Sequence, residues 1–138
     1  MAGYSRTPLL KKLGIKEGMS VRFVNAPPGF EKTLGEMPEG ARLASSSRAG
    51  LDFILVFVKT EPELRRRLSE ARTLLSQNGM IWIAWPKKSS GVKTHLSFAE
   101  VQEAGLAAGV VDTKVCAIDD VWSGLKFVIR LKDRAAGG

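Results

Sequence analysis

The chain has 138 residues, of which 44% are hydrophobic and 25% charged, a composition that fits one globular domain and excludes a disordered or fibrous protein. The chain has a single cysteine, which excludes an internal disulfide framework. It also has a single histidine, and one residue of each kind is too few for a Cys/His zinc site. The net charge of +7 favours anionic partners. The longest apolar runs, residues 53–58 and 80–85, are too short to span a bilayer. With no apolar leader at the N-terminus, we expect a cytoplasmic protein without a membrane segment.

The first helix is predicted at residues 7–14, because Thr7 can cap it, Pro8 suits its first turn and Gly14 permits a left-handed stop. A strand, a short helix and a weak second strand follow, at residues 19–25, 30–34 and 41–44.

The middle of the chain carries stronger signals. Residues 53–58 and 80–85 are continuous and apolar, which is typical of strands covered on both faces. Between them, Thr60 and Glu63 form a capping box that predicts a helix start, and Asn78-Gly79 predicts its end.

A second capping box, Ser97 with Glu100, predicts a helix that ends near Gly109. Residues 110–118 and 125–131 then predict two strands joined by a turn at 119–124.

Strands that alternate with helices predict an α/β fold. We expect a compact three-layer, Rossmann-like sheet of about six strands, mostly parallel and ending in an antiparallel hairpin. Residues 1–133 would form one domain, with a mobile tail at 134–138. The last strand alternates apolar and polar residues, so one of its faces is expected to be wet. Ordinary solvation of a half-covered sheet is the simpler explanation for the basic side chains that would line this face. There are four of them: Lys114, Lys126, Arg130 and Lys132.

Two segments resemble the later core of a class I AdoMet-dependent methyltransferase: Leu51-Asp52-Phe53-Ile54-Leu55-Val56, and Leu75-Ser76-Gln77-Asn78-Gly79-Met80-Ile81-Trp82-Ile83. The resemblance implies the strand order 2-1-3-4-6-5, with one of that fold's usual seven strands missing.

A second resemblance covers nearly the whole chain. Its motifs are Gly3-Tyr4-Ser5 to Thr7-Pro8-Leu9, Lys11-Lys12-Leu13-Gly14-Ile15-Lys16, Trp85-Pro86-Lys87-Lys88-Ser89-Ser90-Gly91, and Val115-Cys116-Ala117 to Trp122-Ser123-Gly124-Leu125-Lys126. Together they resemble an uncharacterised family of short bacterial proteins that is grouped with the methyltransferase-like Rossmann folds. The resemblance implies a fold and a bacterial origin, but no activity.

A methyltransferase of that class needs a glycine-rich turn after the first strand and an acidic residue after the second. Here the first turn reads Asn25-Ala26-Pro27-Pro28-Gly29-Phe30, in which two prolines lack N–H donors and only Gly29 is permissive. The second position, residues 44–47, carries no carboxylate. We therefore expect that the AdoMet site has been lost, and we predict no cofactor.

An anion-binding loop is predicted where the strand at residues 80–85 ends, since open α/β sheets bind ligands at that edge. Its candidate residues offer ammonium, hydroxyl and backbone donors: Lys87, Lys88, Ser89, Ser90 and Gly91. A solvated lysine loop accounts for the same residues equally well.

Other candidates have simpler explanations. Asp119 and Asp120 fit turn chemistry. Cys116 fits a small core residue, and His95 is not obviously near enough to activate it. Arg65-Arg66-Arg67 fits a solvated helix face with four-residue ion pairs, Glu61 to Arg65 and Glu63 to Arg67.

The leading hypothesis is a non-catalytic module that binds an anionic small molecule or partner. Its candidate site comprises the loop at residues 87–91 together with Asn25 and Gly29, without a metal and without catalytic residues. Three alternatives stay open: a basic nucleic-acid-binding protein, a divergent AdoMet-dependent methyltransferase, and a domain that binds a protein partner through an uncovered sheet face.

Overall fold

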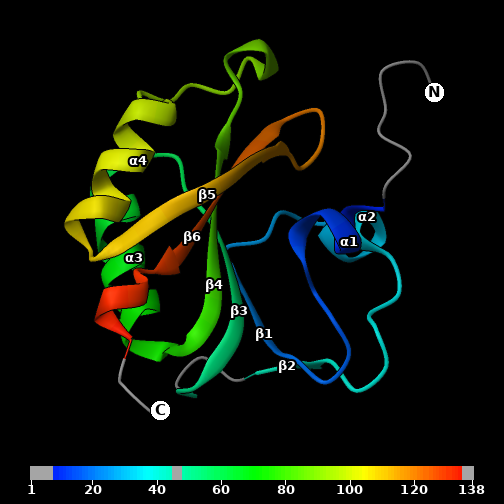
Figure 1. The fold of residues 1–138 in the computed structure, drawn as a ribbon. Coiled ribbons are helices and arrows are strands. Elements are labelled where there is room, and N and C mark those ends of the chain that lie inside the picture. The colour runs from blue at the N-terminus through cyan, green and yellow to red at the C-terminus, as the bar shows by residue number, and fades with distance from the viewer. Residues whose placement is uncertain (1–7, 45–47, 135–138) are drawn as a thin grey trace.

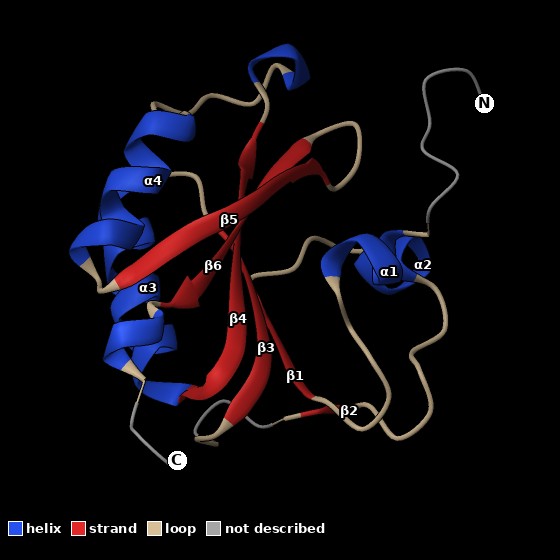
Figure 2. Ribbon diagram, viewed as in Figure 1, coloured by secondary structure: helices blue, strands red, loops and turns tan. Residues whose placement is uncertain are grey.

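The computed structural model describes residues 8–44 and 48–134. Six strands form one sheet in the order β2-β1-β3-β4-β6-β5 (Figures 1 and 2). Their bounds are β1 (Ser20–Val24), β2 (Arg42–Leu43), β3 (Leu51–Phe57), β4 (Leu75–Pro86), β5 (Val110–Ala117) and β6 (Trp122–Ile129). The predicted cap Thr7 and residues 135–138 of the predicted tail lie outside the described residues.

The sheet is parallel from β2 to β4, and β6 runs antiparallel to both β4 and β5. This mixed arrangement confirms the predicted fold class. The strand order is also the one that the resemblance to class I methyltransferases implied.

Helices cover both faces of the sheet, which makes three layers. In Figure 1, α3 and α4 lie on one side of the sheet and α1 and α2 on the other. Their bounds are α1 (Leu9–Leu13), α2 (Phe30–Leu34), α3 (Glu61–Leu74) and α4 (Phe98–Ala107), with short 3₁₀ turns η1 (Lys88–Ser90) and η2 (Leu131–Asp133). In the described part of the chain, none of the helices is both long and apolar enough to cross a bilayer.

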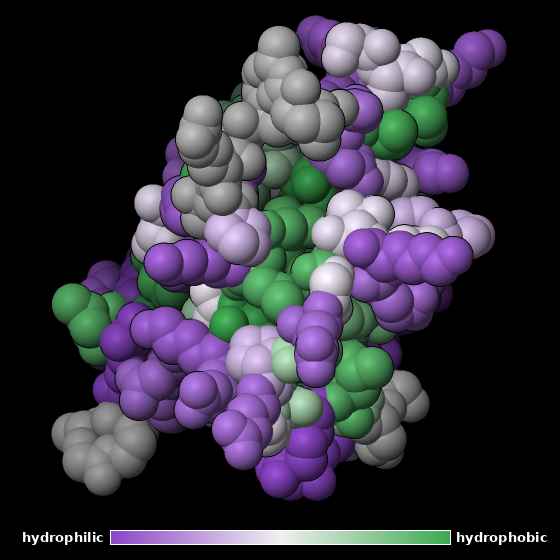
Figure 3. Space-filling model, turned by 90° about the vertical axis from the view of Figure 1, so that its right-hand side faces the viewer, coloured by the Kyte–Doolittle hydropathy of each residue, from purple (hydrophilic) through white to green (hydrophobic). Residues whose placement is uncertain are grey.

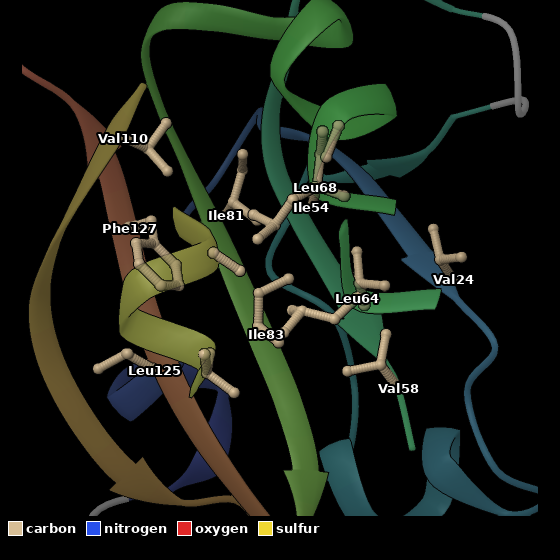
Figure 4. Packing of buried hydrophobic residues seen from close by; sticks show 14 of the residues in the cluster. Val24, Ile54, Val58, Leu64, Leu68, Ile81, Ile83, Val110, Leu125 and Phe127 are labelled. Carbon is tan, nitrogen blue, oxygen red and sulfur yellow. The ribbon is translucent and has the colours of Figure 1, made fainter. Parts of the chain in front are cut away.

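The face under α3 and α4 holds an aliphatic core. Leu64 and Leu68 of α3 are fully buried, and they pack with strand residues such as Ile54, Ile81 and Phe127 (Figure 4). Burying a side chain of this size contributes about 1.5–3 kcal/mol. The period of four between the α3 leucines therefore fixes which face of the helix meets the sheet.

The face under α1 and α2 holds an aromatic core. Trp82 of β4 is fully buried and its indole N–H donates to the Leu13 carbonyl oxygen at 2.8 Å, which ties the end of α1 to the sheet. Phe30 of α2 meets Phe57 of β3 edge to face, with 5.1 Å between ring centroids. Two five-residue helices are too short to be stable alone, so these contacts hold them in place.

The prediction that Asn78-Gly79 ends the third helix is wrong. The helix ends at Leu74 and β4 begins at once, with Asn78 and Gly79 inside an irregular stretch of the strand. A Cβ on Gly79 would lie 2.8 Å from the Leu51 carbonyl oxygen. Glycine is needed there because the backbone of β3 comes so close, which is the role glycine has at many bulges.

The predicted turn at residues 119–124 is shorter than expected, because β6 begins at Trp122. Asp119 accounts for the turn that remains, since its carboxylate accepts hydrogen bonds from the N–H groups of Val121 and Trp122 at 2.8 and 2.9 Å. β6 also ends earlier, at Ile129, so Arg130 and Lys132 do not extend a basic strand face as predicted.

The predicted ion pairs of α3 are half right. Arg65 pairs with Glu61 at 3.0 Å, as the four-residue spacing indicated. Arg67 pairs instead with Glu70 at 3.3 Å. Glu63 is left for other partners, and these lie at the carboxyl edge of the sheet.

Candidate functional site

A hollow of about 430 Å³ lies at the carboxyl ends of β1 and β3, and we call it the β1–β3 pocket. Open α/β sheets bind ligands at this edge, and pockets of this size accommodate small molecules. The described residues that line it come from the segment after β1, the end of β3, α3 and β6: Asn25, Ala26, Pro27, Pro28, Phe57, Lys59, Glu63 and Trp122.

Asn25 links the three elements that form one wall of the pocket, β1, β3 and α3. Its backbone is left-handed, with φ of 58°, a conformation that asparagine tolerates better than most residues. Its side-chain amide donates to the Glu63 carboxylate at 3.2 Å and lies 3.5 Å from the Phe57 carbonyl oxygen. The end of β1 is therefore bonded to both β3 and α3.

Glu63 is the carboxylate among the described lining residues, and both of its oxygens are engaged. One accepts from the Asn25 amide, and the other accepts from the backbone N–H of Lys59 at 3.1 Å. The Glu63 backbone N–H in turn donates to the Thr60 hydroxyl at 3.3 Å. The capping box predicted from sequence thus exists in modified form, with the glutamate reaching Lys59 rather than Thr60.

The floor of the pocket is aromatic. Phe57 and Trp122 meet edge to face with ring centroids 5.0 Å apart, and both rings are buried. Such a pair is rigid and apolar. Pro27 and Pro28 line the same hollow with further apolar surface that cannot donate a backbone hydrogen bond.

A second hollow, of about 330 Å³, adjoins the β1–β3 pocket because Lys59 lines both. Its other described lining residues are Thr60, Lys93, Thr94 and His95. Thr94 is bonded in place, since its hydroxyl donates to the Lys59 carbonyl oxygen at 2.6 Å. In the part of the chain that the structure describes, neither Lys59 nor Lys93 forms an ion pair. The two hollows together offer aromatic surface on one side of Lys59 and positive charge on the other.

The loop predicted to bind anions lies apart from this pocket, above the end of β4 in Figure 1. Its Ser90 hydroxyl is used internally, because it donates to the Lys87 carbonyl oxygen at 2.6 Å and accepts from the Val92 N–H at 3.1 Å. Gly91 takes the left-handed conformation that ends η1, with φ of 79°. Lys88 and Ser89 are exposed. The ammonium groups of Lys87 and Lys88 remain as donors for a ligand.

Of the two candidates in the first turn, Asn25 lines the pocket and Gly29 does not. Gly29 is the N-cap of α2, with φ of 81°. Its permissive backbone therefore serves the helix start rather than the pocket wall.

Sequence reasoning missed Phe57, Lys59, Glu63 and Trp122 as pocket residues. One available signal was their position, since Phe57 and Lys59 stand where a buried parallel strand ends. Trp122 had no such signal, because it was assigned to a turn.

Cys116 and His95 are not a catalytic pair. Cys116 packs with the core on the α1 and α2 face, whereas His95 lines the hollow beside Lys59. Burial raises the pKa of the Cys116 thiol, although the charges of Lys12 and Lys114 oppose the shift. Within residues 8–44 and 48–134, no three side chains of His, Cys, Asp or Glu come close enough together to hold a metal ion.

Solved structures with the same fold include several SAM-dependent methyltransferases. The chain is similar to a SAM-dependent methyltransferase from Aquifex aeolicus, with a TM-score of 0.62, 19% identity and 88% of each chain covered. It is also similar to a TehB-like SAM-dependent methyltransferase from Corynebacterium glutamicum, with a TM-score of 0.55, 10% identity, and coverage of 94% of this chain and 91% of that one. A third is the Aeropyrum pernix fibrillarin with bound S-adenosyl-L-methionine, with a TM-score of 0.56, 15% identity, and coverage of 91% and 70%. At these identities the similarity establishes the fold alone.

A family model described as "Protein of unknown function (DUF3052)" matches residues 11–131. None of the curated proteins matches the chain.

Proposed function

The chain belongs to the DUF3052 family, and we propose that it is a non-catalytic Rossmann-like module that binds an anionic small molecule in the β1–β3 pocket. One observation carries the proposal: Lys59, which forms no ion pair with the described residues, lines a hollow whose floor is aromatic. A ligand with one anionic group and one planar apolar part would match this site, with the anion at Lys59 and the planar part on the rings of Phe57 and Trp122.

Lys93 supports the assignment of an anion. It lines the hollow on the far side of Lys59, so two lysines stand at one end of the site, and the His95 ring beside them offers a further hydrogen-bonding group. Ammonium groups bind phosphate and carboxylate as point charges, and a charge-assisted hydrogen bond contributes about 1.5–3 kcal/mol.

The proposal that the module is non-catalytic rests on Glu63. General-base catalysis needs a carboxylate that can take a proton from the substrate. The Glu63 oxygens accept hydrogen bonds from Asn25 and from the Lys59 backbone instead, so this group maintains the shape of the pocket.

The residues present do not fit AdoMet as the resemblance to methyltransferases would require. Pro27 and Pro28 occupy the turn where bare backbone N–H groups would meet the cofactor. The segment after β2, residues 44–47, has no carboxylate for the ribose hydroxyls. We therefore propose that this binding motif has been lost, and we derive no methyl transfer.

We keep the loop at residues 87–91 as a second proposed anion site, separate from the pocket. Lys87 and Lys88 offer ammonium groups there, and the loop is anchored by the Lys87 N–H, which donates to the Val121 carbonyl oxygen at 2.7 Å. The same titration tests both positions.

The test is an amide chemical-shift titration of labelled protein with three probes in separate runs: adenosine 5′-monophosphate, inorganic phosphate and AdoMet. We expect adenosine 5′-monophosphate to shift the Asn25 and Lys59 amides and the Trp122 indole. Lys59→Ala should weaken this binding about tenfold, the equivalent of one charge-assisted hydrogen bond. Lys32→Ala, which removes an exposed lysine from α2, is the matched control and should leave the affinity unchanged.

Three outcomes would redirect the proposal. Shifts confined to residues 87–91, lost in Lys88→Ala, would move the site to that loop. Saturable AdoMet binding in the pocket would favour the divergent methyltransferase. An equal loss of affinity in Lys59→Ala and Lys32→Ala would show that only net charge attracts the probe.

A further inference from the structure

Four lysines from separate parts of the chain gather on the sheet face that carries α1 and α2, over β5 and β6. We call Lys12, Lys16, Lys114 and Lys126 the lysine cluster. Lys114 and Lys126 stand directly opposite each other in the antiparallel pair of β5 and β6. Side chains in that position share one face of the sheet, with Cβ atoms about 5 Å apart.

The other two lysines come from α1 and the segment after it. The Lys114 ammonium donates to the Lys12 carbonyl oxygen at 3.1 Å, which joins β5 to the last turn of α1. Burial lowers the pKa of Lys126, and the charges of Lys114 and Lys16 lower it further. Lys16, Lys114 and Lys126 are therefore close enough to interact electrostatically, and the charges of Lys12 and Lys114 both act on the Cys116 thiol.

The charge of the cluster is not compensated within the described residues. The ion pairs found there involve Arg22, Arg65 and Arg67, and none reaches these lysines. Like charges directly opposite each other destabilise a strand pair. The Lys12 carbonyl oxygen accepts one hydrogen bond from Lys114, but no carboxylate of the described residues neutralises the pair, and such a broken local rule is typical of a functional site.

The surroundings limit what the cluster can bind. Next to the lysines on this face lie aliphatic side chains, since Val128 pairs with Val111 and Met80 in the strand register. Trp82, beside Lys126, is fully buried and offers no ring for stacking. Figure 3 shows the molecule from the side of α1 and α2, with a hydrophobic area bordered by hydrophilic side chains. Binding of single-stranded nucleic acid relies on stacking of bases on exposed aromatic rings, so this face favours a compact anion.

We propose that the lysine cluster binds a chain of phosphate groups, such as the triphosphate of a nucleotide or inorganic polyphosphate. Three or four negative charges in a row match the ammonium groups of the paired Lys114 and Lys126 and of Lys16, whose charges interact. Lys12 lies near enough to Cys116 to add a fourth positive charge to this face. Lys126 is half-buried, so it meets the anion in a sheltered position where screening by salt is weaker. This site uses none of the residues of the β1–β3 pocket and does not rest on the function proposed for it.

The chain provides its own reporter for the test. Cys116 is the single cysteine, and it lies on the same face as the cluster, two residues after Lys114. A ligand held by the lysines should slow alkylation of its thiol by iodoacetamide, a neutral reagent that the lysines do not attract. Calorimetric titration with inorganic tripolyphosphate would measure the affinity and stoichiometry of the same event.

We expect one tripolyphosphate per chain and clear protection of Cys116. Lys126→Gln should weaken binding about tenfold. Lys132→Gln removes an equal charge from the exposed η2 turn and is the matched control. Urea unfolding of Lys126→Gln should show a fold at least as stable as the wild type, because the substitution removes a repulsion. A loss of affinity then reflects the site rather than unfolding.

Adding adenosine triphosphate identifies the source of the phosphate chain. Equal affinity for both probes indicates recognition of the phosphates alone, and tighter binding of the nucleotide indicates a nucleotide ligand; either supports the proposal. The absence of saturable tripolyphosphate binding would overturn it, as would equal losses in Lys126→Gln and Lys132→Gln. Protection of Cys116 by a single-stranded oligonucleotide but not by tripolyphosphate would replace it with a nucleic-acid surface.

Discussion

The hydrogen bond between Trp82 and Leu13 offers a direct measure of what holds α1 on the sheet. The Trp82 indole is fully buried, and its N–H donates to the Leu13 carbonyl oxygen at 2.8 Å. Trp82→Phe keeps an aromatic ring in place but removes the donor. The carbonyl is then left without this partner in the core, and the short helix loses its link to β4.

The magnitude follows from two losses. A buried carbonyl deprived of its donor costs about 1–3 kcal/mol. The smaller ring leaves unfilled space and loses buried area, together worth about 1–2 kcal/mol. The sum is about 2–5 kcal/mol, a large part of the ~5–15 kcal/mol typical of a domain. For a chain of this length the midpoint of thermal unfolding should fall by about 7–17 °C.

Trp85→Phe is the matched control for this prediction. Trp85 lies on the same strand but faces the α3 and α4 core, and its side chain forms no hydrogen bond with the described residues. Trp85→Phe should therefore lower the free energy of unfolding only by the packing contribution, about 1–2 kcal/mol. Urea unfolding followed by circular dichroism gives both free energies without relying on tryptophan fluorescence. Equal losses in the two variants would refute the argument, because the hydrogen bond to Leu13 would then contribute nothing.

Three further predictions concern the fold. A Cβ on Gly105 would overlap the ring of Phe127, so Gly105→Ala should destabilise the protein by about 1–3 kcal/mol, measured by thermal unfolding. Thr60→Ala removes the hydroxyl that accepts from the Glu63 N–H and should cost about 1 kcal/mol in urea unfolding; a value near zero would contradict the cap. Burial lowers the pKa of Lys126 in the folded state, so the unfolded chain binds more protons between that pKa and the ordinary lysine value, and stability rises with pH across that window. Unfolding curves of Lys126→Met should lack this part of the rise; an unchanged pH dependence would show that Lys126 does not carry it.

Local sequence patterns were enough to predict most of the helices and strands. The apolar runs at residues 53–58 and 80–85 became β3 and β4 because a strand buried on both faces needs continuous apolar residues. Thr60 caps α3 as expected, since an N-cap depends only on the first turn of the helix. The strand order could be predicted only from the resemblance to class I methyltransferases, because the sequence of one strand does not determine which other strand it pairs with.

The candidate site was harder to predict, because its contacts join distant residues. Asn25 meets Glu63 across 38 positions, which diverts that glutamate from the expected ion pair with Arg67. Of the predicted site residues, Asn25 lines the pocket, whereas residues 87–91 form a separate loop. Whether those positions bind an anion stays a prediction.

The pattern of residues along the chain was enough to predict an α/β domain with buried central strands and an antiparallel end, since the period of apolar residues sets the type of each element and how it is covered. Which charged groups meet depends instead on how distant elements pack together. Lys12, Lys16, Lys114 and Lys126 share one face because of the β5–β6 register and the position of α1. Alternation along a strand separates its two faces, but the packing of other elements decides what each face meets. The net positive charge of this protein is therefore evident from its composition, whereas the gathering of four lysines over β5 and β6 is a property of the fold.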